Sequence, residues 1–261
     1  MNEGIAYLES HPILTILICA ITGYLMGSIS FARIVFRGVT KEKEPEAYSE
    51  PIAGTDEKFD TDFVSASLVN KRIGARYGCL TSVADMLKVI LPTLGTKLLL
   101  TSEPYFLIVT IFAMIGHYLP VYHHFKGGRG ETIMLGSMIV FNWVGTIIVF
   151  CISTLLGFVT GSVVVLRYAI YFLMVFWLWH HYHDWRYALG MFILIGLFIF
   201  SMRKELALIA ELRKRGLMND TNEELSEKMF MGRHLGRAVD RYSIPALLKK
   251  LRSDKTEKQG K

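Results

Sequence analysis

The sequence has few cysteines and no positive charge near its start. Its 261 residues include three cysteines, Cys19, Cys79 and Cys151, which lie within or beside apolar segments at no spacing typical of a metal site. We interpret them as packed thiols and expect neither a metal nor a cofactor. No lysine or arginine precedes Ile13. Because the charged start of a cleavable signal peptide is missing, we expect the first apolar run to remain as a membrane span.

Apolar residues are abundant and clustered. They make up 52% of the chain, and a membrane-spanning helix needs about 20 consecutive, mostly apolar residues. Seven segments meet or approach that length: Ile13–Phe36, Cys79–Leu100, Tyr105–Val121, Thr132–Asn142, Trp143–Val159, Ser162–Trp179 and Trp185–Met202. Only helices and closed barrels satisfy their backbone in lipid. We therefore predict an all-α, polytopic membrane protein with about seven transmembrane helices, although weak breaks at Asn142 and Gly161 allow other divisions.

Positive charge gathers in alternate loops. The loop 36–78 holds 7 lysines and arginines, and the segment from Arg203 onward holds 15, whereas residues 1–12 hold none. The positive-inside rule then places the N-terminus outside and the C-terminus in the cytoplasm of a cell-membrane protein. Since this topology accounts for the net charge of +6, we expect no nucleic-acid partner.

The chain is expected to divide into a membrane domain, 1–205, and a basic cytoplasmic tail, 206–261. Within the tail, apolar Tyr242, Ile244, Leu247, Leu248 and Leu251 alternate with cations. That pattern is typical of an amphipathic helix on anionic lipid, and a solvated tail is the alternative. The end of the chain, from Asp254, is expected to be disordered.

A polar, glycine-rich segment separates two of the apolar runs. Gly116-His117-Tyr118-Leu119-Pro120 is followed after four residues by Phe125-Lys126-Gly127-Gly128-Arg129-Gly130. Glycines let backbone amides approach a ligand, and Lys126 and Arg129 supply charge, which suits a phosphate at the bilayer surface. The alternative is a tight basic turn between two helices.

Polar residues within the predicted spans indicate a groove. Ser28 and Arg33 lie toward the end of the first span, and Asp85 and Lys88 lie three residues apart on one face of the second. Charges inside a membrane usually face a polar interior. An internal Asp85–Lys88 pair is the alternative. His180 to Asp184 has the residue types of a metal site, but we interpret it as a polar turn at the membrane interface.

Three stretches resemble the membrane-embedded, acyl-phosphate-dependent glycerol-3-phosphate acyltransferases of bacteria. Gly23–Phe31 is similar to that family's first helix, Gly/Ala-Tyr-Leu-Leu-Gly-Ser-Ile-x-Phe. Gly116–Gly130 is similar to its Gly-His-x-x-Pro…Phe-Lys-Gly-Gly-Lys-Gly loop, with Arg129 in place of Lys. Ile73–Lys88 is similar to Leu-Gly-x-x-x-Gly…Asp-x-x-Lys-Gly. The resemblance covers about residues 15–205.

Two other family motifs differ. Where the family has Gly-Ser-Gly-Asn-x-Gly-Ala-Thr-Asn and then Arg, an ungapped comparison gives residues 60–68, with Thr61 at the Ser position and Lys71 at the Arg position. In the alternative alignment, the family motif corresponds to residues 53–55 and the residues that follow are an insertion. After the last helix, Met202 and Glu205 replace His and Asn. Since Asp60 and Asp62 repel a phosphate, we predict that glycerol-3-phosphate is a poorer substrate than the resemblance suggests.

The resemblance implies transfer of an acyl group from acyl-phosphate to glycerol-3-phosphate, giving 1-acyl-glycerol-3-phosphate for phospholipid synthesis. The implied partners are these two substrates and membrane lipids, and the oligomeric state stays open. An enzyme of the same fold with another acceptor, and a non-catalytic lipid-binding relative, are the alternatives.

The resemblance also implies residue roles. The leaving phosphate would be held by Lys126, Arg129 and the amides of Gly127, Gly128 and Gly130. The acceptor phosphate would pair with Lys71, Arg72 and Arg203. The implied catalytic set is His117, Thr61 and Lys71, with Asp60 or Asp62 as alternative bases and a structural hydrogen bond as the alternative role of His117.

Overall fold

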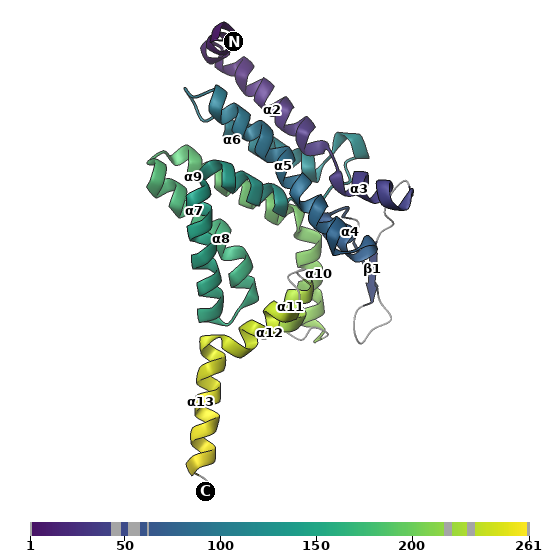
Figure 1. Cartoon of the computed structure of the whole chain (residues 1–261), viewed down its shortest axis with the longest axis vertical. Coiled ribbons are helices and arrows are strands. Elements are labelled where there is room, and N and C mark those ends of the chain that lie inside the picture. Colours follow the sequence, from purple (N-terminus) through teal and green to yellow (C-terminus); the bar gives the residue numbers. More distant parts are fainter. Residues whose placement is uncertain are drawn as a thin grey trace.

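The chain folds into packed helices. The computed structural model describes residues 2–42, 48–51, 58–61, 63–216, 221–228 and 233–259. The described helices are α1 (Asn2–Ser10), α2 (Pro12–Ser28), α3 (Phe31–Thr40), α4 (Ala66–Ile73), α5 (Ala75–Leu99), α6 (Phe106–Tyr118), α7 (Glu131–Thr160), α8 (Val163–Tyr182), α9 (Trp185–Ser201), α10 (Arg203–Lys214), α11 (Asn222–Lys228), α12 (Arg233–Tyr242) and α13 (Ile244–Gln259). The sequence did not predict the antiparallel pair β1 (Tyr48–Pro51) and β2 (Lys58–Thr61). Figure 1 shows the chain ends at opposite ends of the long axis.

Among the described residues, five helical segments are long and apolar enough to cross a bilayer: Pro12–Thr40, Ala75–Leu99, Phe106–His123, Glu131–Thr160 and Val163–Tyr182. The predicted all-α, polytopic membrane class is confirmed. The predicted count of seven spans is not confirmed. Two of the predicted spans, Thr132–Asn142 and Trp143–Val159, correspond to the two parts of α7 on either side of a kink at Asn142, where the sequence indicated a break. The last predicted span corresponds to the 17-residue helix α9.

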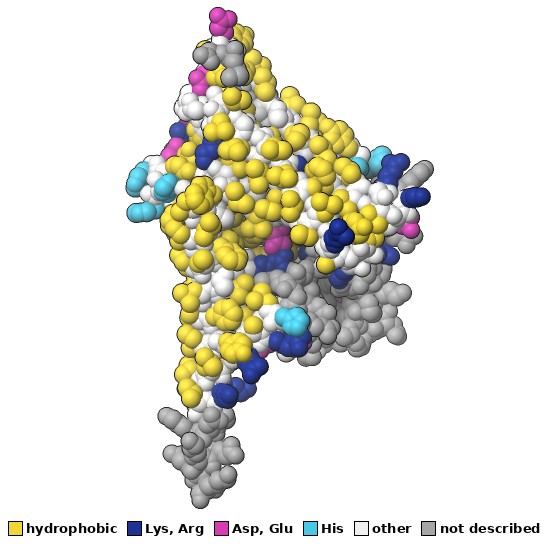
Figure 2. Space-filling model, in the orientation of Figure 1, with side chains coloured by type: hydrophobic (Ala, Val, Ile, Leu, Met, Phe, Trp, Pro, Cys, Tyr) yellow, Lys and Arg dark blue, Asp and Glu magenta, His cyan; other side chains and the backbone are white. Residues whose placement is uncertain are grey.

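The outer surface of the helices is apolar. Figure 2 shows hydrophobic side chains spread over the upper face of the molecule and down its α7–α8 edge. Large apolar side chains such as Ile13, Leu98, Trp143 and Phe176 are more than half exposed. A soluble monomer rarely exposes apolar area on this scale, whereas lipid covers it in a membrane protein.

Helix α7 bends at Asn142, whose backbone lies outside the helical region at φ −159° and ψ 99°. The bend leaves carbonyl groups without a hydrogen-bond donor from the helix itself. The Nζ atom of Lys97 takes that place and donates to the carbonyl oxygens of Val140 at 2.6 Å and Phe141 at 3.0 Å. The Oδ1 atom of Asn142 accepts from the amide of Gly145 at 2.6 Å and so caps the second half. The break is therefore built from specific contacts.

Helices α2 and α6 touch through glycine. A Cβ atom on Gly23 would collide with the carbonyl of Val109, and one on Gly27 would collide with that of Ala113. A Cβ atom on Gly116, near the end of α6, would collide with the carbonyl of Tyr24. Small residues permit this close approach of membrane helices. The contact fixes where the glycine-rich loop begins.

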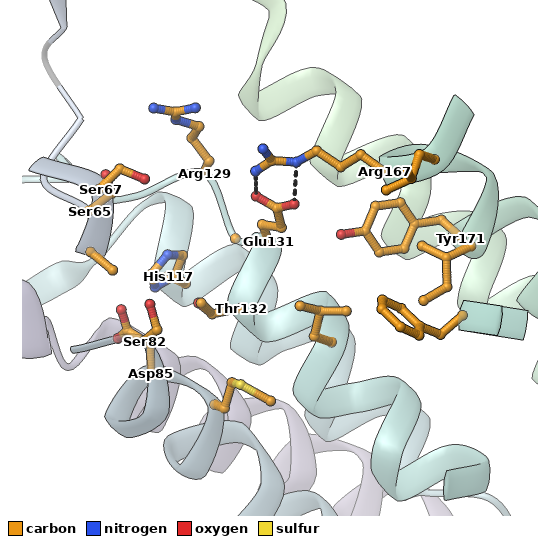
Figure 3. A pocket seen from close by; sticks show the side chains of 17 residues that line it. Ser65, Ser67, Ser82, Asp85, His117, Arg129, Glu131, Thr132, Arg167 and Tyr171 are labelled. Atoms are coloured by element: carbon orange, nitrogen blue, oxygen red, sulfur yellow. Dashed lines mark hydrogen bonds and ion pairs between the residues drawn. The ribbon is translucent and has the colours of Figure 1, made fainter. Parts of the chain in front are cut away.

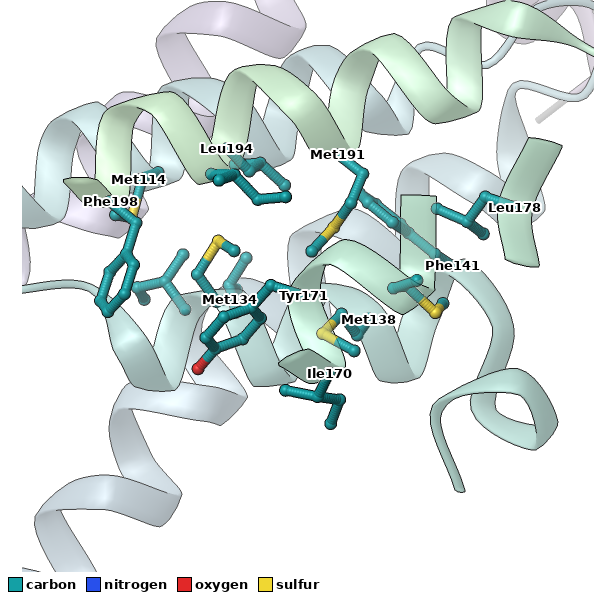
Figure 4. Packing of buried hydrophobic residues seen from close by; sticks show 14 of the residues in the cluster. Met114, Met134, Met138, Phe141, Ile170, Tyr171, Leu178, Met191, Leu194 and Phe198 are labelled. Carbon is teal, nitrogen blue, oxygen red and sulfur yellow. The ribbon is translucent and has the colours of Figure 1, made fainter. Parts of the chain in front are cut away.

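Methionine dominates the core among α6, α7, α8 and α9. Met114, Met134, Met138, Met174 and Met191 are fully buried and pack in one cluster with Phe141, Leu178 and Leu194. Figure 4 shows Met134, Met138 and Met191 meeting between the helices. Unbranched methionine fills irregular gaps, which suits a core around a bent helix.

The tail docks on the turn between α7 and α8. The side-chain Nδ2 of Asn222 donates to the carbonyl oxygen of Gly161 at 2.8 Å, and its Oδ1 accepts from the amide of Val163 at 3.0 Å. Val239 of α12 is fully buried in one cluster with Val163 and Leu166. Helices α11 and α12 therefore pack against the base of α8.

The last helix differs from the sequence expectation. Helix α13 continues to Gln259, whereas disorder was predicted from Asp254. Its apolar side chains are exposed: Ile244, Leu247, Leu248 and Leu251. Helix α13 includes the stretch for which an amphipathic helix was predicted, and its amphipathic contact with lipid stays a prediction.

We expect Lys97→Met to lower the thermal midpoint of the purified protein in detergent. The substitution removes two charge-assisted hydrogen bonds to buried carbonyls and should cost about 1–3 kcal/mol of unfolding free energy. The neighbouring Leu98→Met, at a lipid-facing position, is the matched control. Equal midpoints for the two variants would contradict the role given to Lys97.

Candidate active site

Lys88 is the centre of a buried polar cluster. Its Nζ lies 2.9 Å from Oδ1 of Asp85, 2.5 Å from the carbonyl oxygen of Ile29 and 3.0 Å from Nδ1 of His117. Lys88 and Asp85 are each 2% exposed. An ammonium group has three protons, and here each finds an acceptor. A charge can be buried at a tolerable cost when it is paired and hydrogen-bonded in this way.

This contact also assigns the tautomer of His117. An ammonium group cannot accept a hydrogen bond, so Nδ1 of His117 accepts and the ring proton lies on Nε2. The Nε2 atom lies against Gly128, where a Cβ atom would collide with it. The geometry therefore favours His117 as a hydrogen-bond donor and not as a base.

The glycine-rich loop is held from both sides by side chains of other helices. Nη2 of Arg33 donates to the carbonyl oxygen of Lys126 at 2.8 Å. Oγ of Ser201, in the last turn of α9, donates to the carbonyl oxygen of Arg129 at 2.7 Å. The loop is therefore anchored to α3 through Arg33 and to α9 through Ser201.

Backbone geometry explains the glycines of the loop. The amide of Gly128 donates to the carbonyl oxygen of His117 at 3.1 Å, and a Cβ atom on Gly127 would collide with that same oxygen. Gly130 has φ +90° at the start of α7, which a residue with a Cβ atom rarely adopts. The loop thus folds tightly onto His117 and turns directly into the N-terminus of α7, which carries partial positive charge.

A cavity of about 410 Å³ opens beside this loop. Figure 3 shows side chains from α4, α5, α7 and α8 converging on it. Its polar lining consists of Ser65, Ser67, Ser82, Asp85, His117, Arg129, Glu131, Thr132 and Arg167. Its other lining residues are Ala66, Met86, Gly130, Leu135, Phe150, Leu166, Ile170 and Tyr171. The cavity therefore combines cations and hydroxyl groups with an apolar wall.

One wall of the cavity carries an ion pair between α7 and α8. Nε of Arg167 donates to Oε1 of Glu131 at 2.8 Å, and its Nη2 pairs with Oε2. Figure 3 shows the two parallel bonds, with the hydroxyl of Tyr171 pointing toward Glu131. This two-point geometry is typical of a well-ordered arginine–carboxylate pair.

The comparisons with known proteins agree with this architecture. The family model for glycerol-3-phosphate acyltransferase matches residues 17–212. The chain belongs to the glycerol-3-phosphate acyltransferase family. The resemblance seen in the sequence is thereby confirmed, and the tail after residue 212 lies outside the matched segment.

Individual members of the acyltransferase family match over parts of their length. The chain is 36% identical over 127 residues to the glycerol-3-phosphate acyltransferase of Legionella pneumophila (strain Corby), covering 48% of this chain and 40% of that one. It is 30% identical over 166 residues to that of Pelagibacter ubique (strain HTCC1062), covering 60% of this chain and 79% of that one. The chain therefore spans less than half the length of its Legionella relative.

Two crystal structures share the acyltransferase fold. They are of PlsY (YgiH), an integral membrane glycerol 3-phosphate acyltransferase, in its lysophosphatidic acid form and its glycerol 3-phosphate form. Each matches with a TM-score of 0.57 and 20% identity, covering 76% of this chain and 93% of that chain. At this identity the likeness concerns the fold.

Five of the site residues predicted for this acyltransferase-family chain come together. Asp85, His117, Arg129 and Gly130 line the cavity, and Lys88 lies directly behind Asp85 and His117. The sequence left two alternatives for Asp85 and Lys88, an internal ion pair or part of a polar groove. The two residues form the ion pair, and Asp85 also lines the cavity.

Other predicted residues surround the loop without lining the cavity. Ser28 and Arg33 hold it in place, since Oγ of Ser28 accepts from the amide of Val121 at 3.3 Å. Lys126 is exposed, and Gly127 and Gly128 pack against His117.

The residues assigned to the acceptor lie farther away. Lys71 and Arg72 are exposed in the last turn of α4. Arg203 begins α10, bonds the hydroxyl of Tyr118 and lies 4.1 Å from the ring centroid of Phe200. Thr61 ends β2, and its side chain, like those of Asp60 and Asp62, lies outside the described part.

Sequence reasoning missed several lining residues. Arg167 is a lone cation within the predicted span Ser162–Trp179, which by itself signals a functional position. Ser65 and Ser67 lie in the stretch compared with the family's altered motif. Glu131 and Tyr171 gave no signal, because their roles depend on the pairing of α7 with α8.

We expect Lys88→Met to destabilise the protein strongly. It would leave the Asp85 carboxylate buried without a cation, which typically costs about 3–5 kcal/mol. The double variant Asp85→Asn with Lys88→Met removes both charges and should recover part of that loss. The measurement is the thermal midpoint in detergent. Equal destabilisation by the single and double variants would show that the ion pair does not anchor the cluster.

Proposed function

We propose that this protein transfers an acyl group from acyl-phosphate to glycerol-3-phosphate. The observation that carries the proposal is the cavity beside the glycine-rich loop, which is lined by Arg129, His117 and the N-terminus of α7. Membership of the acyltransferase family supports the reaction type.

The charge balance of the cavity supports an anionic ligand. Both lining carboxylates are neutralised, Asp85 by Lys88 and Glu131 by Arg167. Arg129 adds a further positive charge, so three cations face two carboxylates. Burial strengthens the attraction of this net charge for a phosphate.

The proposed step needs no covalent enzyme intermediate, because an acyl-phosphate is already activated. The 1-hydroxyl oxygen of the acceptor attacks the acyl carbonyl carbon, the bond from that carbon to the phosphate oxygen breaks, and the hydroxyl proton leaves with the phosphate. Arg129 and the amides at the start of α7 would bind the leaving phosphate. The Nε2–H of His117 is suitably placed to stabilise negative charge that develops in the cavity.

An enzyme with another acceptor is the second candidate. It is favoured by Lys71, Arg72 and Arg203, which were assigned to the acceptor phosphate but do not line the cavity. The prediction that glycerol-3-phosphate is a poor acceptor therefore stays open, as does a non-catalytic role.

Turnover by the purified protein tests the proposal. We expect release of phosphate from acyl-phosphate to require glycerol-3-phosphate and to yield lysophosphatidic acid. Arg129→Ala should reduce kcat/KM by roughly 30- to 1000-fold, corresponding to about 2–4 kcal/mol of charge-assisted contact. Lys249→Ala, exposed on α13, is the control. Turnover with glycerol but not glycerol-3-phosphate would favour the second candidate, and no turnover with either would reject both enzymes.

We also propose the orientation predicted from charge: N-terminus outside, C-terminus in the cytoplasm of a cell membrane. It is supported by the opposite positions of the chain ends in Figure 1 and by the cations of the tail. The division into a membrane domain, 1–205, and a cytoplasmic tail, 206–261, belongs to the same proposal.

Reporter fusions test this topology. A periplasmic reporter fused after Lys261 should be inactive and a cytoplasmic one active, because the tail cations resist translocation. A fusion at Ser102, in the turn between α5 and α6, should behave in the opposite way. An active periplasmic reporter after Lys261 would overturn the orientation.

A further inference from the structure

Arg167 is a cavity cation to which the proposed reaction has not yet assigned a role. It comes from α8, whereas Arg129 belongs to the loop before α7, so the two guanidinium groups reach the same cavity from different elements. In Figure 3 both groups lie along one rim of the cavity. The Arg167 side chain is 14% exposed, so any anion that reaches it is itself partly removed from water.

The proposed reaction needs two anion sites, because donor and acceptor each carry a phosphate. The loop amides and Arg129 account for one. The cations that the sequence assigned to the other, Lys71, Arg72 and Arg203, do not line the cavity. Among the described lining residues, the remaining cation is Arg167.

We propose that Arg167 binds the phosphate of glycerol-3-phosphate and thereby determines acceptor specificity. This inference rests on the proposed function. The planar guanidinium group carries five N–H donors in a rigid arrangement, and Nε and Nη2 already pair with Glu131. Such a group suits phosphate oxygens better than a lysine does. Tyr171, one helical turn along α8, lines the same wall and contributes a hydroxyl group.

Glu131 partly neutralises this cation. Its two oxygens pair with Nε and Nη2 of Arg167, and both side chains line the cavity. A carboxylate beside a phosphate site also repels the ligand. Glu131 therefore lowers the affinity of Arg167 for an anion, and removal of its charge should strengthen acceptor binding.

The experiment is steady-state kinetics with each substrate varied in turn. We expect Arg167→Gln to raise KM for glycerol-3-phosphate by about 10- to 100-fold and to leave KM for acyl-phosphate within about twofold. Discrimination between glycerol-3-phosphate and glycerol should fall by the same factor. Arg167→Lys keeps the charge without the planar guanidinium group and should give an intermediate KM.

Glu131→Gln is the matched control, because it disrupts the same ion pair without removing the arginine. We expect KM for glycerol-3-phosphate to fall, because the substitution removes a negative charge beside the proposed phosphate site. If the pair only ties α7 to α8, Arg167→Gln and Glu131→Gln should instead impair both substrates alike and lower the thermal midpoint together. That result, or an unchanged KM in Arg167→Gln, would overturn the inference.

Failure of the proposed function is distinguishable. If the wild-type protein shows no turnover, isothermal titration with glycerol-3-phosphate gives the same comparison through Kd. Binding that is lost in Arg167→Gln and kept in Glu131→Gln supports the site even in a non-catalytic protein. Equal binding by the wild type and Arg167→Gln rejects it. If Arg167→Gln does not fold, the same KM and Kd comparisons are made with Arg167→Lys.

Discussion

The buried ammonium group of Lys88 is the interaction on which the rest of the site depends. It joins three segments, since its acceptors are Asp85 on α5, the carbonyl oxygen of Ile29 after α2, and His117 on α6. A buried ion is costly unless its protons are all accepted, so these segments have one favourable arrangement. Glycine contacts between α2 and α6 fix the same arrangement from the backbone side. The loop that follows α6 therefore has a defined position before any ligand arrives.

Much of this arrangement was predictable from short-range pattern. The three-residue spacing of Asp85 and Lys88 places both on one helical face, and the structure pairs them at 2.9 Å. The glycine-rich loop was recognisable because its glycines and cations interrupt apolar sequence. The contact of His117 with that loop follows from the chain reversal the loop makes. In each case the pattern lies within a few residues, so local geometry decides the outcome.

Long-range pairings were not predictable. Glu131 and Arg167 are 36 residues apart and meet only because α7 packs against α8. The sequence indicated the break at Asn142 but not its contact with Lys97, which lies 43 residues from Val140. No periodicity encodes which helices become neighbours. For the same reason, the family resemblance assigned Lys71, Arg72 and Arg203 to the acceptor but did not indicate that Arg167 lines the cavity.

The altered motifs and the cavity can be understood together. Met202, where the family has His, is buried in the methionine-rich core, so this position serves packing. Glu131 adds a carboxylate next to the retained glycine-rich loop, and by itself that charge would repel a phosphate. Arg167 neutralises it from α8 and, at the same time, adds hydrogen-bond donors to the cavity wall. Because α8 is also the helix on which α11 and α12 dock, the tail outside the matched family segment packs directly behind the wall that carries this arginine.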